Sequence, residues 1–175
     1  MPTNSLNVSG IKSGFTWDFQ RTTAFGSSTS NAGNFNYSTS LTNGTGAGKC
    51  SIFYADEFDI AASGTANIDL AAGVTDVFGN SVSFAKIRLI YIQVVTDTDL
   101  VKVGTSILVG GHASAVTSFF GDASDKIRIR NGGCFQLSAI DATGYAVTAT
   151  TADMIKIVNE DSSAAVTVRI GVVGE

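Results

Sequence analysis

The segment Phe84–Thr96 constrains the fold of this chain more than any other, because an extended strand of this composition is apolar on both faces. Its first face carries Ile87, Leu89, Tyr91 and Val95, and its second face carries Ile90, Ile92 and Val94. Such a strand belongs inside a packed sheet. We expect the first face to lie in the core. The second face begins with Lys86 and Arg88, which we expect to be exposed to solvent, and continues with apolar residues that we expect to be buried. We therefore expect the N-terminal arm, the Phe119-Phe120 loop or another subunit to cover it.

Shorter strands separated by turn residues account for the region that follows residue 48. Apolar and polar residues alternate strictly at 125–130 and at 166–172, and turn residues recur about every 8–12 positions. A short strand is expected at Leu100–Val103, and hairpin turns are expected at Asn131–Gly133 and Asn159–Ser163. Only 113–121 fits a helical turn as well as a loop. The pattern predicts an all-β protein, a jelly-roll-like antiparallel β-sandwich.

Residues 1–48 differ from the predicted sandwich domain, 49–175, because Ser, Thr, Asn and Gly dominate them. Phe15, Trp17 and Phe19 share one face of a short strand and form the one apolar patch in this region. We expect an extended N-terminal arm whose aromatic residues dock on the domain or on a neighbouring molecule. The alternative is a long, partly disordered leader.

The charge balance and the apolar runs exclude several classes of partner. Fifteen acidic and eleven basic residues give a net charge of −4, without a basic run of the kind that binds nucleic acid. No segment reaches the roughly 18 apolar residues of a membrane span. The N-terminus has no basic segment followed by an apolar run, so we expect synthesis in a cytoplasm without a signal peptide.

Three features of the sequence resemble sites of chemistry: a glycine-rich loop, a histidine and a pair of cysteines. Residues 43–50, NGTGAGKC, resemble a phosphate-binding loop, but Asn43 replaces its first Gly and Cys50 replaces its hydroxyl residue. A hinge leading into the first core strand fits better. His112 is the sole histidine, beside Gly110-Gly111, and is expected to be a loop residue. Cys50 and Cys134 are read as small buried thiols, with a disulfide between them left open.

Acidic residues cluster at Asp56, Glu57 and Asp59, at Asp97 with Asp99, and at Glu160 with Asp161. Paired carboxylates serve glycoside hydrolysis or calcium binding when they face each other. Solvated turns explain these clusters better. The sequence therefore predicts no enzyme, no metal site and no cofactor, and a hydrolase using Asp56 or Glu57 ranks last.

Several short phrases, taken in order over residues 41–175, resemble small β-sandwich structural proteins of tailed bacteriophages, in particular capsid decoration or cement proteins. The phrases are 41–49 (LTNGTGAGK), 68–70 (IDL), 76–80 (DVFGN), 84–87 (FAKI), 109–111 (VGG), 131–133 (NGG), 147–153 (VTATTAD), 157–159 (IVN) and 170–174 (IGVVG).

The resemblance implies a virion protein that binds the outside of a phage head through the major capsid protein, commonly as a homotrimer. Phe15, Trp17 and Phe19 would anchor the arm on a neighbouring subunit, since buried aromatic side chains dominate such contacts. Ile90 and Ile92, on the uncovered face of the central strand, are further expected contacts. The alternative from another class is a carbohydrate-binding or receptor-binding module of a phage fibre.

Overall fold

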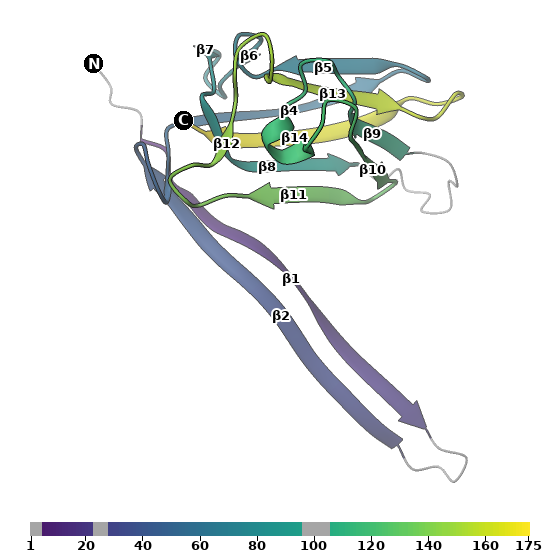
Figure 1. Ribbon diagram of the computed structural model, residues 1–175. Coiled ribbons are helices and arrows are strands. Elements are labelled where there is room, and N and C mark those ends of the chain that lie inside the picture. The colour runs from purple at the N-terminus through teal and green to yellow at the C-terminus, as the bar shows by residue number, and fades with distance from the viewer. Residues whose placement is uncertain (1–4, 23–27, 96–105) are drawn as a thin grey trace.

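The computed structural model describes residues 5–22, 28–95 and 106–175, and within them the fold is almost entirely β (Figure 1). The predicted strand Leu100–Val103 and the acids Asp97 and Asp99 lie outside this part of the chain. The elements are β1 (Val8–Thr22), β2 (Ser28–Asn43), β3 (Lys49–Cys50), β4 (Ile52–Ile60), β5 (Thr65–Asp69), β6 (Val74–Thr75), β7 (Ser81–Val82), β8 (Lys86–Val94), β9 (Ser106–Gly110), α1 (Thr117–Phe120), β10 (Lys126–Arg130), β11 (Cys134–Ser138), β12 (Tyr145–Ala146), β13 (Met154–Asn159) and β14 (Val166–Gly174).

Two antiparallel sheets pack face to face to form the body. One has the order β11-β8-β14-β4, with β12 paired to β8, and the other has the order β10-β9-β13-β5. Buried side chains of both sheets share one apolar core. The predicted all-β sandwich is confirmed. Successive long strands of the body alternate between the two sheets except at β9 and β10.

The central strand β8 is an interior strand, as predicted, and Ile87 is buried in the core as predicted. From Leu89 onward, beyond a shift in the register with β14, its faces are the reverse of the prediction. Ile90, Ile92 and Val94 are 0% exposed and point into the sandwich core, whereas Leu89 and Tyr91 lie on the outer face and are half-buried. Both faces of the segment are apolar, so alternation alone did not distinguish them. Because Ile90 and Ile92 are covered by this chain itself, their expected role as subunit contacts is wrong.

Arg88 is the second correction in β8, because it is fully buried instead of being solvated. Its Nη2 donates to Glu175 Oε1 at 2.9 Å, and its Nη1 donates to the carbonyl of Asp141. Lys86 Nζ lies 3.1 Å from the same Glu175 oxygen. A buried cation is tolerated when it is paired and hydrogen-bonded. The carboxylate of Glu175 therefore makes the burial of this arginine possible.

Glu175 also ties stability to pH. Burial raises its pKa, but hydrogen bonds from the Gly46 amide and Lys86, with the charge of Arg88, outweigh burial and hold the pKa below 4.5. A carboxyl with a lowered folded-state pKa adds stability above its unfolded pKa and loses it as pH falls through the folded value. We expect the free energy of unfolding to fall below about pH 4.5. Glu175→Gln should reduce that slope in urea titrations, and an unchanged slope would contradict this assignment.

The two predicted hairpin turns connect different sheets. Asn131–Gly133 joins β10 to β11, and Asn159–Ser163 joins β13 to β14. A turn of this length can bridge the roughly 10 Å between packed sheets as well as the gap between paired strands. The hairpin interpretation is wrong at both places. In the ambiguous segment 113–121, α1 forms a single helical turn with Phe120 buried.

Candidate functional site

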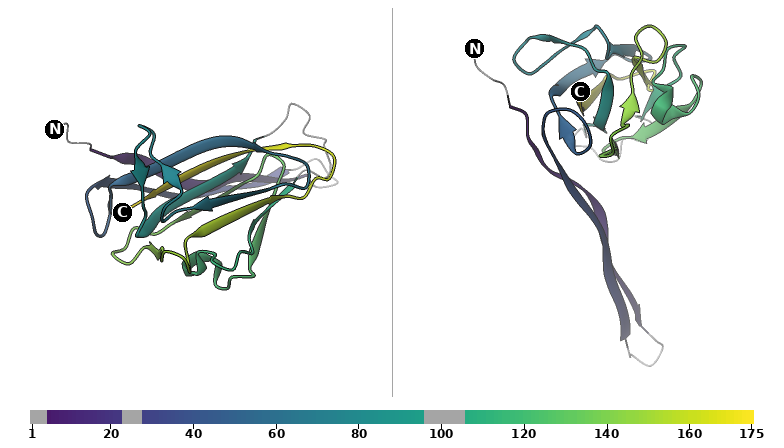
Figure 2. Two further views of the ribbon diagram at one scale, coloured as in Figure 1. Left: turned by 90° about the horizontal axis from the view of Figure 1, so that it is seen from above. Right: turned by 60° about the vertical axis from the view of Figure 1, so that its left-hand side comes forward.

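A long two-stranded arm projects from the body (Figure 1). It is formed by β1 and β2, which pair in register from Ile11 opposite Thr39 to Thr22 opposite Ser28. The expected extended arm is therefore a regular β-hairpin, considerably longer than the short strand predicted around Trp17. Figure 2 shows that it runs away from both sheets and does not fold back over them.

The root of the arm is fixed to the outer face of the sheet that contains β8. Ile11, Leu41 and Cys50 are buried against Val173 of β14, and Leu89 and Phe53 pack against the same cluster. This second small core covers one end of the outer sheet face. It holds the base of the hairpin while the remainder extends into solvent.

One face of the hairpin is aromatic, because residues of odd number in both strands point to the same side. Phe15 lies opposite Phe35, with ring centroids 5.5 Å apart, and the Trp17 ring lies 5.2 Å from Phe35. Phe15, Phe19 and Phe35 are 61%, 66% and 66% exposed, and Tyr37 is 43% exposed. We call these four residues and Trp17 the aromatic face. The opposite face carries polar side chains such as Thr16 and Asn34.

The structure places Phe15, Trp17 and Phe19 together on this face, as predicted, and adds two residues that the sequence interpretation missed. Phe35 and Tyr37 are separated by one residue in β2, within a run of Asn, Ser, Thr and Gly. Their spacing of two was the available signal for a second aromatic strand. The weakly β-forming neighbours concealed it.

Trp17 lies across the partner strand at Gly33. A Cβ atom built on Gly33 would come within 2.4 Å of the indole Cζ2 atom, so only glycine leaves room for the ring. The indole nitrogen donates to Asn31 Oδ1 at 2.9 Å. The ring therefore lies over the backbone of Gly33 and is less exposed than the phenyl rings beside it.

Gly33→Ala is expected to displace the indole and shift its fluorescence emission to longer wavelength. The added methyl group would occupy the position over Gly33 where the ring packs, so the ring would gain contact with water. The chain has one tryptophan, so the emission reports on Trp17 alone. Gly171→Ala is the matched control, since no atom lies within 4 Å of a Cβ built there. Equal spectra for Gly33→Ala and the unsubstituted chain would contradict the described packing.

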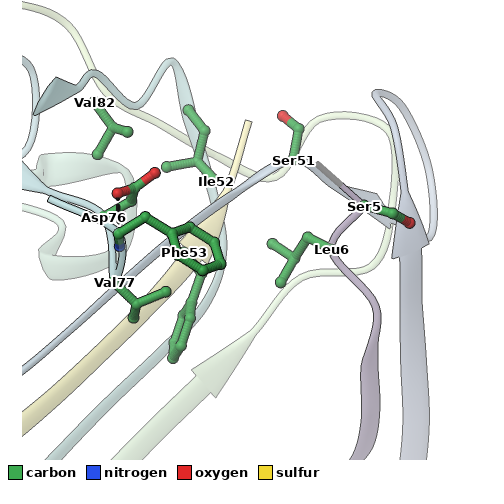
Figure 3. A pocket seen from close by; sticks show the side chains of 9 residues that line it. Ser5, Leu6, Ser51, Ile52, Phe53, Asp76, Val77 and Val82 are labelled. Carbon is green, nitrogen blue, oxygen red and sulfur yellow. Dashed lines mark hydrogen bonds between the residues drawn. The ribbon is translucent and has the colours of Figure 1, made fainter. Parts of the chain in front are cut away.

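A pocket of about 330 Å³ lies at the root of the arm, lined mainly by apolar side chains. Figure 3 shows Leu6, which precedes β1, on one side and the residues around β6 and β7 on the other. We call it the root pocket. Its lining residues are Ser5, Leu6, Ser51, Ile52, Phe53, Asp76, Val77, Phe78 and Val82.

The turn between β6 and β7 leaves two apolar side chains exposed at this pocket. Val77 is 54% exposed and Phe78 is 74% exposed. Asp76 holds the turn by accepting hydrogen bonds from the amides of Phe78 and Asn80 and from the Asn80 side chain. Those bonds, the Asn80 side chain first, hold the pKa of Asp76 below its ordinary value. The carboxylate is thus occupied by its own turn.

The acidic cluster of β4 forms no facing pair. Glu57 is bonded to Arg169 and Asp59 accepts from Thr167 Oγ1 at 2.6 Å, both across the outer face of the sheet. Asp56 accepts from the Tyr54 hydroxyl at 3.3 Å. These acids belong to a strand, so their assignment to solvated turns is wrong. Glu160 is bonded to Arg128 at 2.8 Å.

The other sequence candidates lie apart from one another. The loop Gly44–Gly48 joins β2 to β3 and is followed by a strand, so it lacks the helix N-terminus that a phosphate-binding loop uses. His112 is a loop residue whose Nδ1 accepts the Ser114 amide at 3.0 Å. Cys50 is buried, as expected, but Cys134 is exposed on β11, and both thiols are free.

Comparisons with protein-family models, curated proteins and solved structures find no match. Over residues 5–22, 28–95 and 106–175, no three His, Cys, Asp or Glu side chains gather as a metal site would require. In the same ranges, no helix has the length and apolar character needed to cross a bilayer. Exposed large apolar side chains of the described residues gather at two places, the aromatic face and the root pocket.

Proposed function

We propose that this chain is a structural virion protein that binds the outside of a phage capsid and stabilises it, with the major capsid protein as partner and a homotrimer as the assembled form. The observation that carries the proposal is the arm: a hairpin of twelve register pairs whose aromatic face has no cover in the described chain. An isolated two-stranded hairpin is at best marginally stable in water. The arm thus needs a second surface.

The body supports the same proposal. Jelly-roll sandwiches occur in viral capsid proteins and in lectins, so the fold is compatible with both functions expected from the sequence. On the outer sheet face, Glu57 is paired with Arg169, and Asp59 accepts a hydrogen bond from Thr167. A rigid sandwich with an anchored projecting arm is suited to linking neighbouring subunits of a shell.

The carbohydrate-binding alternative receives less support from the aromatic face. Sugar rings stack on flat, open aromatic surfaces, whereas the rings of Phe15, Trp17 and Phe35 are tilted by 41–69° to one another. The polar group of Trp17 is also occupied within the hairpin by Asn31. A glycan array with the full chain tests this alternative, and reproducible binding of one glycan class would favour it.

The proposal is tested by producing the chain together with the major capsid protein encoded in the same genome and sedimenting the shells. We expect the chain to co-sediment with shells, and light scattering to give a mass about three times 18.1 kDa. The double substitution Phe15→Ser with Phe35→Ser should abolish co-sedimentation, while Thr16→Ser on the polar face should not. A chain that remains in the supernatant with intact shells would overturn the proposal.

A further inference from the structure

We infer that the aromatic face of one copy docks into the root pocket of a second copy, so that the copies are joined arm to root. The inference rests on the proposed function, since it names the contact by which the assembling copies recognise each other. It treats the two uncovered apolar surfaces as the two halves of one interface.

The distribution of exposed apolar side chains is the first support. Among the described residues, the large hydrophobic side chains that are exposed are, apart from Ile140, those of the aromatic face and of the pocket rim: Phe15, Phe19, Phe35, Tyr37, Val77 and Phe78. Monomeric proteins rarely expose contiguous apolar patches of this kind without using them. The aromatic face and the root pocket are separate patches on one chain. They require either two different partners or a single contact, between one patch and the other, that repeats from copy to copy.

The shapes and charges of the two surfaces are complementary. The aromatic face presents projecting rings, whereas the root pocket is concave and lined by apolar side chains such as Leu6, Phe53 and Val82. No residue of the aromatic face is charged, and the carboxylate in the pocket, Asp76, already accepts hydrogen bonds from its own turn. Docking would therefore bury one carboxylate, and that carboxylate keeps the hydrogen bonds of its own turn, which reduces the cost of its burial.

The contact has to form between copies because the arm cannot reach its own pocket. The pocket lies at the root, beside Leu6. The aromatic residues Phe15, Trp17 and Phe19 follow the buried root residue Ile11 along β1, on a hairpin that leads away from the body (Figures 1 and 2). A contact between two different surfaces repeats from copy to copy and closes into a ring when the rotation allows it. This is compatible with the trimer proposed above.

The area available agrees with a specific contact. With about 200 Å² per aromatic side chain, the four exposed residues leave roughly 470 Å² of apolar surface open on the arm. A standard interface buries about 800 Å² on each partner. The aromatic face therefore supplies more than half of one side, and the strands that carry it can supply the remainder.

The test is cross-linking between two differently tagged full-length variants, both with Cys134→Ser to remove the exposed native thiol. One carries Ser13→Cys, on the aromatic face opposite Tyr37, and the other carries Ser51→Cys, in the pocket lining. Neither change removes an apolar side chain. A short bismaleimide should link the two variants when they are mixed. Thr16→Cys, on the polar face, replaces Ser13→Cys as the matched control and should give no product.

Adding Phe35→Ser to the Ser13→Cys chain should lower the yield about tenfold or more, as expected for an aromatic anchor at an interface. Circular dichroism verifies that the body stays folded. Links between two Ser13→Cys chains alone would show arms packed face to face and overturn the inference, as would the absence of any product in the mixture. Co-sedimentation with shells is measured separately. Cross-linking without co-sedimentation would retain the inference and reject the proposed function. Co-sedimentation without cross-linking would retain the proposed function and reject the inference.

Discussion

Glu175→Ala is expected to lower the free energy of unfolding by about 3–5 kcal/mol, the loss typical of breaking a buried ion pair from one side. The substitution leaves the buried guanidinium of Arg88 without its carboxylate. The Nε atom of Arg88 already has no hydrogen-bond partner, so the remaining bonds to carbonyl groups cannot compensate. Urea unfolding at neutral pH measures the effect as a lower midpoint with an unchanged m-value.

Glu57→Ala is the matched control, because it removes a carboxylate from Arg169 on the solvated face of the same sheet. Both partners of that pair are about half exposed, and such pairs contribute under about 1 kcal/mol. The double substitution Arg88→Met with Glu175→Ala should recover part of the loss, since it leaves no buried charge. If Glu175→Ala cost no more than Glu57→Ala, the buried network would have no special role.

Ile92→Ala is expected to cost about 2–5 kcal/mol of unfolding free energy, because it opens a cavity in the middle of the core. Ile92 is 0% exposed, and its strand is paired on both sides, with β11 and β14. Denaturant unfolding of the isolated chain measures the loss. Shell binding by the fraction that remains folded should be unchanged, since the side chain contacts no surface.

Phe19→Ala provides the opposite pattern and serves as the control. It removes a larger apolar side chain, but one that is 66% exposed on the arm, so unfolding of the isolated chain should change by less than about 0.5 kcal/mol. The two substitutions together separate core residues from docking residues. A larger loss for Phe19→Ala than for Ile92→Ala would contradict the assignment of faces.

The interior position of β8 was predictable because two apolar faces leave a strand no exposed side. Which face points inward was not predictable from this segment alone. The register of β8 with β14 shifts between Leu89 and Ile87, so Ile87 and Ile90 both lie in the core although they are three residues apart. The choice therefore depends on the pairing with a distant strand and not on local alternation.

More of the arm than of the pocket could be predicted from the sequence. Phe15, Trp17 and Phe19 alternate within one strand, so their common side followed from the period of a strand. The pairing with Phe35, and the glycine that seats Trp17, required the register of a partner strand rich in Asn and Ser. The root pocket is lined by Leu6, Phe53 and Val82, which come from separate segments of the chain, so no local sequence motif predicted it.

Because the two strands of the arm pair in regular register, the number of residue pairs fixes the length of the arm. Its twelve pairs from Ile11 to Thr22 correspond to about 40 Å at the usual rise per residue of a strand. Removing one residue from each strand would turn the rings beyond the deletion to the polar side, whereas removing two from each would shorten the arm by about 7 Å and keep their side. The spacing between linked copies is thus adjustable only in steps of two residues per strand, so arm length and subunit spacing must change together.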